Sequence, residues 1–257
     1  MKLNLKLKTR IAEQKASEII KEFGIYHPSH IRLHDIAFAL GVQIKEGSLR
    51  GAAARLIRIG NRAVIRIPQT ETNAPRRRFS IAHELGHFVL AHEGMALEIV
   101  CTEKDMMNWY DMDKETEANY FASELLMPEV LVKQRCDVKE VSFEPVKKIA
   151  TDFDTSLTSA AIRFVKFCPE PCALICSEDA KIKWFVKSEE WWPFIRKGQK
   201  LDKRTLAIEY FIGQEIPDEG QEMNADVWLD DPKVSNIFEH SFAMKQYGLV
   251  LTLLWIT

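Results

Sequence analysis

The sequence lacks the features that define several classes of protein. It has no stretch of about 18 apolar residues, which an α-helix needs to cross a bilayer. Its basic start is not followed by the apolar core of a secretory signal. The formal net charge is only −2, so neither the phosphates of nucleic acids nor acidic lipids attract the chain overall. We therefore expect a globular protein with no membrane partner.

Cysteine is scarce and odd in number. The five cysteines are Cys101, Cys136, Cys168, Cys172 and Cys176. An odd number in a chain of 257 residues argues against a disulfide framework and for free thiols in a reducing cytoplasm. Three of them lie in "CPEPCALIC", which lacks the two-residue spacing and the second ligand pair of zinc sites. Buried thiols are the preferred interpretation, with metal binding and oxidant sensing as alternatives.

The stretch "FSIAHELGHFVLAHE", residues 79–93, carries the clearest chemical pattern. His83 and His87 are four residues apart, so their side chains project side by side on a helix. Two imidazoles in this arrangement can bind one Zn²⁺ at roughly 2.0–2.1 Å. Glu84 lies at the edge of the same face, where a carboxylate can take a proton from a water molecule that zinc activates. The pattern predicts a zinc hydrolase centre with two histidine ligands and Glu84 as the general base.

A third zinc ligand is expected from outside this helix. The positions where metzincins carry a glycine and a third histidine hold Leu90 and Glu93, which excludes that class. His92 lies five residues after His87 and points well away from it, so we expect His92 at the surface or behind the ligands. A glutamate from a later helix is the remaining solution.

The stretch "ETEANYFASELLMP" offers three glutamates: Glu115, Glu117 and Glu124. Glu115 shares a helical face with Ala118 and Ala122, at i+3 and i+7, and their small side chains let that face approach the metal helix closely. Glu117 shares its side with bulkier residues. We therefore prefer Glu115 as the third ligand, with Glu117 as the second candidate.

Periodicity and capping signals predict the elements around these motifs. Asn73 as an N-cap and Pro75 in the first turn begin the metal helix, and Pro128 ends the glutamate helix. A loop is expected at roughly 99–113. Further helices are expected at 10–24, 30–42, 142–153 and 156–166, and strands within 172–188 and in the final run "YGLVLTLLWIT".

The segment "RLIRIGNRAVIRI" predicts a β-hairpin that turns at Gly60-Asn61. One parity carries four isoleucines that we expect to be buried: Ile57, Ile59, Ile65 and Ile67. The other parity carries three arginines that either face an acidic substrate loop or form a solvated surface: Arg58, Arg62 and Arg66. We also expect an extended peptide to pair with the edge of this hairpin.

"RRRFSIAHELGHFVLAHE" followed by "ETEANYFASELLMP" resembles the ImmA/IrrE family of zinc peptidases, and the order of elements over residues 10–166 is similar to that family. The resemblance implies a gluzincin-like metallopeptidase with His83 and His87 as zinc ligands and Glu84 as the general base. The family's glutamate precedes an Ala-Asn pair by two intervening residues, which matches Glu115. Characterised members relieve repression by cleaving a helix-turn-helix repressor.

The resemblance and the change of texture along the chain predict an α+β protein in three parts. Residues 1–135 are expected to form a zincin (gluzincin-like) peptidase domain with the HExxH helix and a small β-sheet. Residues 136–168 are expected to form a helix-turn-helix-like helical segment. Residues 169–257 are expected to form a strand-rich, GAF-like regulatory domain.

We therefore expect a cytoplasmic, zinc-dependent, site-specific endopeptidase that cleaves a partner helix-turn-helix repressor and relieves repression of stress or mobile-element genes. The alternative is a non-catalytic, zinc-containing regulator that binds DNA or a partner protein. A structural zinc site normally has four protein ligands, whereas three candidates converge here. DNA binding is disfavoured because acidic residues offset the basic ones of 142–166, which are Lys147, Lys148, Arg163 and Lys166.

Overall fold

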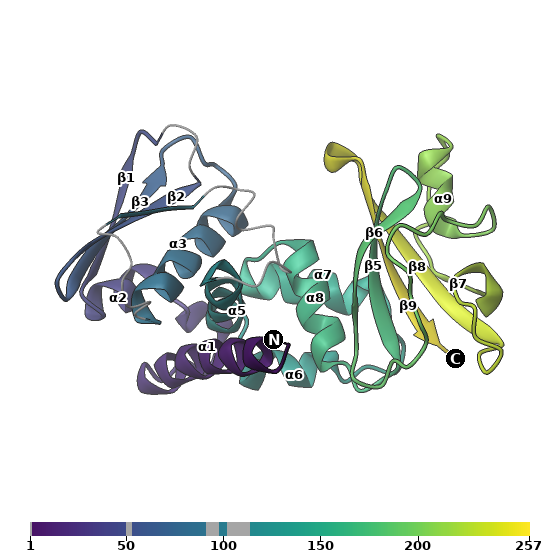
Figure 1. Ribbon diagram of the computed structural model, residues 1–257, viewed down its shortest axis with the longest axis horizontal. Helices are drawn as coiled ribbons and strands as arrows, with labels where there is room; N and C mark the ends of the chain where they lie inside the picture. The colour runs from purple at the N-terminus through teal and green to yellow at the C-terminus, as the bar shows by residue number, and fades with distance from the viewer. Residues whose placement is uncertain (1, 50–52, 91–97, 102–113) are drawn as a thin grey trace. The chain divides into compact units, whose positions relative to one another are not determined.

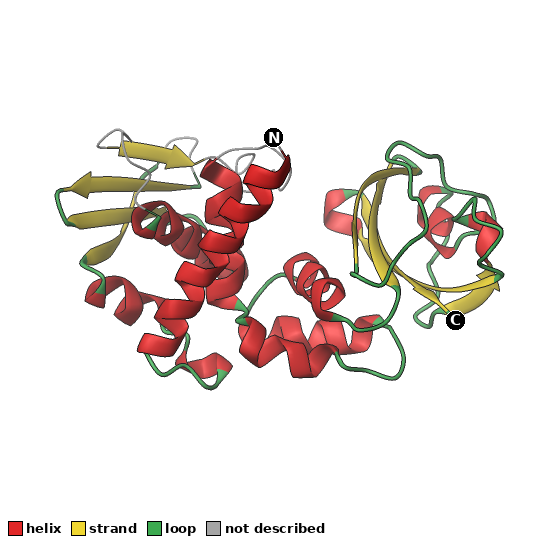
Figure 2. Ribbon diagram, turned by 60° about the horizontal axis from the view of Figure 1, so that its bottom comes forward, coloured by secondary structure: helices red, strands yellow, loops and turns green. Residues whose placement is uncertain are grey.

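The computed structural model describes residues 2–49, 53–90, 98–101 and 114–257. By its contacts the chain divides into two compact units, which we describe separately (Figures 1 and 2). The first comprises residues 1–131 and 151–156, and the second comprises residues 132–150 and 157–257. The domain boundaries at 135 and 168 stay predictions. Among the residues described, no helix is both long and apolar enough to span a bilayer.

The first unit stacks helices on a four-stranded sheet. Its elements are α1 (Lys2–Glu22), η1 (Pro28–His30), α2 (Leu33–Ala39), β1 (Val42–Gly47), β2 (Ala54–Ile59), β3 (Arg62–Pro68), α3 (Ala74–Val89), β4 (Glu98–Cys101) and α5 (Lys114–Leu126). Helix α3 packs against β2 and β3, α5 packs against α3, and α1 packs against α5. The sheet therefore supports α3, and α5 is held between α3 and α1.

Helix α3 begins where its capping signals predict. The Asn73 side chain accepts a hydrogen bond from the backbone N–H of Arg76 at 2.9 Å, and Pro75 lies in the first turn. This satisfies one of the donors that every helix start leaves free, and it fixes the register of the helix. Residues 80–87 of α3 are all buried, so the segment that carries the two histidines and Glu84 lies inside the unit.

The strand order of this sheet is β1-β3-β2-β4. Strand β1 is parallel to β3, whereas β2 is antiparallel to both β3 and β4. Both strands of the predicted hairpin are therefore flanked by other strands, and the outer edges among the described strands belong to β1 and β4. The expectation that a peptide pairs with the edge of the hairpin is wrong, because the parallel strand β1 and the short strand β4 occupy both sides.

The hairpin forms as predicted around Gly60-Asn61. The predicted buried face is correct for β3 and wrong for β2. Leu56 pairs with Ile65, and Ile57 pairs with Val64. Paired residues share a face, so the buried face takes even positions on β2 and odd positions on β3. Ile65 and Ile67 are buried as expected, while β2 buries Leu56 instead of Ile57. The side chain of Ile59 lies outside the description.

The three hairpin arginines do not form one row. Arg58 pairs with Ala63 and so lies on the face toward α3, where its guanidinium stands 5.2 Å from the centre of the Phe88 ring. Arg62 and Arg66 lie exposed on the opposite face of β3. The expectation of a single basic surface is therefore wrong, again because parity changes across the turn.

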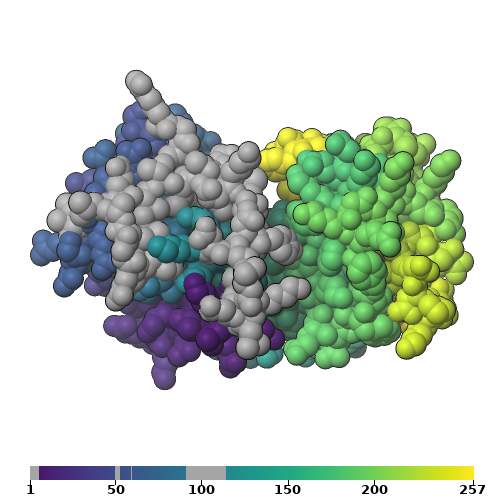
Figure 3. All heavy atoms as spheres, in the orientation of Figure 1, coloured from purple at the N-terminus to yellow at the C-terminus, as the bar shows by residue number. Residues whose placement is uncertain are grey.

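The second unit is built on a five-stranded antiparallel sheet with the order β6-β5-β9-β8-β7. Its elements are α7 (Phe143–Phe153), α8 (Leu157–Phe167), β5 (Cys172–Glu178), β6 (Lys181–Lys187), α9 (Leu206–Phe211), β7 (Gln221–Asn224), η2 (Ala225–Val227), β8 (Asn236–Met244), η3 (Lys245–Tyr247) and β9 (Leu249–Ile256). Strand β9, predicted from the final apolar run, is buried between β5 and β8. In Figure 3 the part of this unit from β5 onward is coloured green to yellow.

The two faces of this sheet are covered by different elements. Helix α8 packs against β5 and β6, and the ring of Phe143 on α7 contacts His240 and Phe242 of β8. The other face carries α9 and the connecting loops, whose core includes Trp191 and Trp228 (Figure 1). Side chains alternate along a strand, so Cys172 and Cys176 of β5 face the helical side while Ile175 faces α9.

Several elements were not anticipated from the sequence. Strand β1 was not predicted, and β4 occupies the start of the expected loop at 99–113, whose remainder lies outside the described residues. Helix α6 (Glu129–Cys136) follows Pro128 directly, so the proline separates two helices rather than ending the helical region. Helices α7 and α8 agree with the predicted ones to within a residue.

Candidate metal centre

Three side chains from two helices converge in the first unit. His83 and His87 come from α3, and Glu115 comes from the first turn of α5. The two Nε2 atoms are 3.0 Å apart, and the Glu115 carboxylate lies 3.0 Å from Nε2 of His83 and 3.4 Å from Nε2 of His87. All three ligand atoms lie within 4.8 Å of one another. Among the described residues, this is the group of histidine, cysteine and carboxylate side chains whose geometry suits a metal ion.

The spacing of these atoms fits a small cation. Ligands at 2.0–2.1 Å from a tetrahedral zinc ion are about 3.3 Å from one another. The observed separations of 3.0, 3.0 and 3.4 Å are close to that value. Two imidazoles and a carboxylate are also the donor set that catalytic zinc sites use when they leave one position open. The residues present therefore fit Zn²⁺.

Asn119 sets the protonation of the first histidine. Its Oδ1 lies 2.9 Å from Nδ1 of His83, and both side chains are fully buried. An amide oxygen only accepts hydrogen bonds, so Nδ1 of His83 carries the proton and donates it. With Nδ1 engaged by Asn119, Nε2 is the ring nitrogen that remains to bind a metal ion, and it faces His87 and Glu115. Sequence reasoning used Asn119 only to align Glu115 with the family motif, although its place four residues after Glu115 indicates the same helical face.

Glu84 is the sequence neighbour of a metal-ligand candidate and is not in the ligand group itself. It follows His83 on α3, and its side chain is fully buried. Its carboxylate does not belong to the group of three converging ligands. A carboxylate next to a metal site but outside the ligand set is available for proton transfer.

The other two glutamates of α5 have different contacts. Glu117 forms an ion pair with Lys8 of α1 at 3.1 Å. Glu124 accepts hydrogen bonds from the Ser17 hydroxyl at 2.9 Å and from the backbone N–H of Glu129 at 3.1 Å, so it ties α1 and the start of α6 to α5. Of the three candidates, the structure brings Glu115 to the histidines and engages the other two elsewhere.

The carboxyl of Glu115 is held in its ionised form. Burial alone would raise its pKa, but hydrogen bonds and charge interactions with His83 and His87 outweigh burial and lower the pKa well below its usual range. The side chain is 27% exposed, so solvent reaches the site from the Glu115 side. An ionised carboxylate at an accessible position is suited to bind a cation.

Close packing of α3 and α5 makes this convergence possible. Gly86 has no Cβ, and one placed there would lie 3.1 Å from the Phe121 ring and 3.2 Å from backbone atoms of Ala118. Ala82, Ala118 and Ala122 are fully buried. Small residues on both helices therefore set the short distance that ligands from the two helices require.

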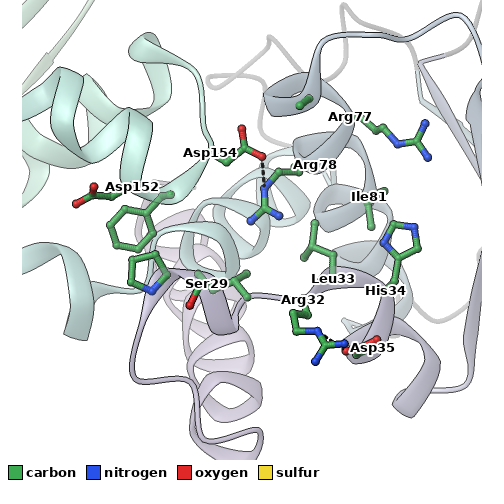
Figure 4. A pocket seen from close by; sticks show the side chains of 14 residues that line it. Ser29, Arg32, Leu33, His34, Asp35, Arg77, Arg78, Ile81, Asp152 and Asp154 are labelled. Atoms are coloured by element: carbon green, nitrogen blue, oxygen red, sulfur yellow. Dashed lines mark ion pairs between the residues drawn. The ribbon is translucent and has the colours of Figure 1, made fainter.

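Two other histidines of the first unit do not join this group. His30 in η1 and His34 in α2 are both exposed. His92 lies outside the described residues. A surface hollow of about 540 Å³ lies elsewhere in the first unit, between α2, the start of α3 and residues 152–154 (Figure 4). It is lined by paired charges such as Arg78 with Asp154, at 3.6 Å, and contains none of the three ligands.

Together, the α+β fold of the first unit and the convergence of two histidines and a glutamate are features that metallopeptidases have. Residues 37–165, half of the chain, match the family model of the IrrE N-terminal-like domain, peptidase family M78. The chain belongs to this family. Its membership supports a zincin-like peptidase fold and indicates a regulatory metallopeptidase of the IrrE/ImmA type.

One solved structure has a similar fold over nearly the whole chain. It is a transcriptional regulator from Mycobacterium tuberculosis, with a TM-score of 0.59 and 13% sequence identity. The match covers 95% of this chain and 76% of the other. At this identity the similarity concerns the fold alone. No curated protein matches the chain.

Proposed function

We propose that this protein is a zinc-dependent, site-specific endopeptidase that cleaves a partner helix-turn-helix repressor and so relieves repression of stress or mobile-element genes. The observation that carries the proposal is the convergence of His83, His87 and Glu115, together with the buried Glu84 that follows His83 on α3. Membership of a peptidase family supports the same reaction class. A regulatory substrate is supported by the matched family model, the IrrE N-terminal-like domain.

Each residue of the site has a distinct task in this proposal. His83, His87 and Glu115 would hold the zinc ion, and Asn119 would keep His83 in the tautomer that presents Nε2. Zinc supplies Lewis acidity toward water and toward the scissile carbonyl. Glu84 takes the proton from the attacking water and returns it to the departing amine. Burial of Glu84 shields this transfer from bulk solvent and keeps the carboxylate in place.

The second unit is proposed to regulate or dock the substrate rather than to bind DNA. We propose that α7 and α8 form a helix-turn-helix-like segment. The five-stranded sheet, which has helices on both faces, supports a GAF-like fold for the rest of the unit. Arg163 is only 1% exposed, and Lys147 pairs with Glu144 at 2.7 Å. Two of the four basic residues of this segment are therefore engaged within the protein, which leaves little positive charge for phosphates.

A non-catalytic regulator is the second candidate, favoured by the fold similarity to a protein named as a transcriptional regulator. The substitution Glu84→Gln separates the two. It preserves size and hydrogen bonding but removes the base, so zinc content stays unchanged. Cleavage of the repressor encoded beside the gene should fall by ~10²–10⁴, the range for loss of a general base. The matched control is Glu117→Gln, which changes a glutamate that pairs with Lys8 instead.

The assay follows the repressor by mass spectrometry, with zinc-loaded protein, with chelator and with each variant. Chelator should stop cleavage by wild type, and added zinc should restore it. If Glu84→Gln still relieves repression fully in cells, proteolysis is not the mechanism and the non-catalytic candidate is correct. If the variant has lost its zinc as well, Glu84 is a ligand and the assignment of roles is wrong.

A further inference from the structure

The junction between α8 and β5 places two cysteines at the ends of a very short connection. Cys168 directly follows α8, Cys172 is the first residue of β5, and three residues separate them. The backbone N–H of Cys168 donates to the Phe164 carbonyl at 2.8 Å, which continues the hydrogen bonding of the helix. The position of Cys168 is therefore determined by α8, and that of Cys172 by the sheet.

Ser188, which follows β6, forms hydrogen bonds to this connection. Its hydroxyl donates to the carbonyl of Glu170 at 2.8 Å and accepts from the backbone N–H of Cys172 at 3.0 Å. Its own backbone N–H donates to the Cys172 carbonyl at 2.9 Å. Prolines at 169 and 171 further restrict the connection. The two thiols are thus held in a fixed arrangement rather than on a loose loop.

The thiols of Cys168 and Cys172 contact each other through a hydrogen bond. This bond lowers the pKa of Cys168, whereas the same bond and burial raise the pKa of Cys172. Cys168 is 5% exposed and Cys172 is fully buried. Burial raises the pKa of both Cys136 and Cys176 to about 12. Among the described cysteines, Cys168 is the one whose environment favours a thiolate.

We propose that Cys168 and Cys172 form an oxidant-sensitive dithiol, which hydroperoxides convert to an intrachain disulfide that joins the end of α8 to the start of β5. The inference does not depend on the proposed peptidase activity. It separates these two cysteines from Cys176, which lies four residues after Cys172 on the same face of β5. If all these cysteines were inert buried thiols, none of them would react with the oxidant in preference to the others.

The chemistry proceeds in two steps. The Cys168 thiolate attacks one oxygen of the hydroperoxide, the O–O bond breaks, and the other oxygen leaves as an alcohol or water after it takes a proton. Cys168 is then a sulfenic acid. The sulfur of Cys172 attacks the Cys168 sulfur, the S–O bond breaks, and the hydroxide takes the Cys172 thiol proton and leaves as water. Two thiols lose two electrons in total, and the hydroperoxide gains them.

The test exposes the zinc-loaded full-length protein to hydrogen peroxide at neutral pH, with free glutathione in the same tube as a reference thiol. The protein is then denatured and alkylated with iodoacetamide, and trypsin cleaves after Lys166 and Lys181. One peptide thus carries Cys168, Cys172 and Cys176. We expect it to lose two of its three alkylation sites and two hydrogen atoms, with fragment ions that place the bond between Cys168 and Cys172.

Variants assign the roles within the pair. Cys168→Ser and Cys172→Ser should each abolish the disulfide, and a sulfenic acid on Cys168, trapped by dimedone, should accumulate only in the latter. Cys136→Ser and Cys176→Ser are the matched controls and should keep it. The wild-type mapping needs no variant, so it stands even if a substitution affects folding. Alkylation of all three cysteines after the glutathione is oxidised, or pairing with Cys136 or Cys176, would overturn the proposal.

Discussion

At the scale of single residues, the site depends on which glutamate of α5 reaches the histidines. Glu115 and Glu117 are two positions apart, so their side chains leave the helix in different directions. Glu115 contacts His83 and His87, whereas Glu117 pairs with Lys8 at 3.1 Å. Glu115 is therefore the candidate metal ligand, whereas Glu117, two residues later, joins α5 to α1.

The first prediction tests this distinction. Glu115→Gln removes the negative charge that binds the cation, so the purified protein should lose most of its zinc. Glu117→Gln is the matched control and should retain one zinc ion per chain, because it weakens only a partly exposed ion pair, worth roughly 0–1 kcal/mol. Elemental analysis of both proteins decides the matter. Zinc loss in the Glu117 variant alone would show that the third ligand is assigned wrongly.

A second prediction concerns Asn119. Asn119→Ala removes the acceptor that fixes the His83 ring, so zinc affinity should fall by about 10–100-fold, the usual effect of losing a partner of a metal ligand. Asn119→Asp keeps an acceptor at the same position and should restore most of the affinity. Competition with a chelator of known affinity measures both. Equal affinity in the wild type and the alanine variant would mean that packing alone orients His83.

How far the residues of the site could be predicted follows from their separation in the sequence. The pair His83 and His87 is local, so helical geometry alone places both on one side of α3. Glu115 required an argument about which face of α5 is small enough to approach α3. The role of Asn119 was missed, because a hydrogen bond between α5 and α3 depends on the rotation of one helix against the other. Periodicity within α5 places Asn119 on the face of Glu115, but it does not identify the atom on α3 that Asn119 reaches.

At the scale of elements, local sequence signals predicted the helices and the hairpin. They did not predict which strands pair across long stretches of the chain. Asn73 and Pro75 mark the start of α3 by their own chemistry. The parallel pairing of β1 with β3 joins residues that are about 20 positions apart in the chain, and no turn motif announces it. The predicted burial of the hairpin was wrong on β2. Leu56 pairs with Ile65, so the buried positions are even-numbered on β2 and odd-numbered on β3.

The third prediction tests the contact between α3 and α5. Gly86→Ala adds a Cβ 3.1 Å from the Phe121 ring and 3.2 Å from the Ala118 backbone, and a backbone neighbour yields little. Overpacking costs about 1–3 kcal/mol, more than the roughly 1 kcal/mol that alanine gains over glycine in a helix. Both the free energy of unfolding and the zinc affinity should fall, because the ligands come from both helices.

Gly47→Ala is the control for this substitution. Gly47 lies at the end of β1, and an added Cβ would meet no atom within 4 Å. Thermal unfolding and zinc titration of both variants should therefore show an effect of Gly86→Ala alone. A Gly86→Ala protein with higher stability and unchanged zinc affinity would contradict the close approach of the two helices.

At the scale of the whole molecule, the chain divides into two compact units. The metal ligands and their partners all lie in the first unit, whereas the core around Trp191, Trp228 and Leu254 lies entirely in the second. Leu254→Ala should lower the free energy of unfolding by about 2–5 kcal/mol, because Leu254 is fully buried in a packed core. Zinc content should not change.

Hydrogen exchange measured by mass spectrometry locates this effect. Leu254→Ala should accelerate exchange in β5, β8 and β9 and leave α3 and α5 as protected as in wild type. Leu85→Ala, at a fully buried position of α3, is the counterpart and should accelerate exchange in α3 and α5 and reduce zinc binding. Parallel loss of zinc in the Leu254 variant would show that the metal centre depends on the second unit.

The position of β9 in its sheet bears on the order in which the protein is synthesised. Every residue of the first unit precedes residue 157, so a nascent chain holds all the groups of the metal centre well before the second sheet can close. Strand β9 lies between β5 and β8 yet follows both in the chain. Until residue 256 has left the ribosome, β5–β6 and β7–β8 are separate pairs whose inner edges can pair with other chains. Translation thus makes the metal-binding unit first and leaves the second unit exposed to aggregation for as long as β9 is missing.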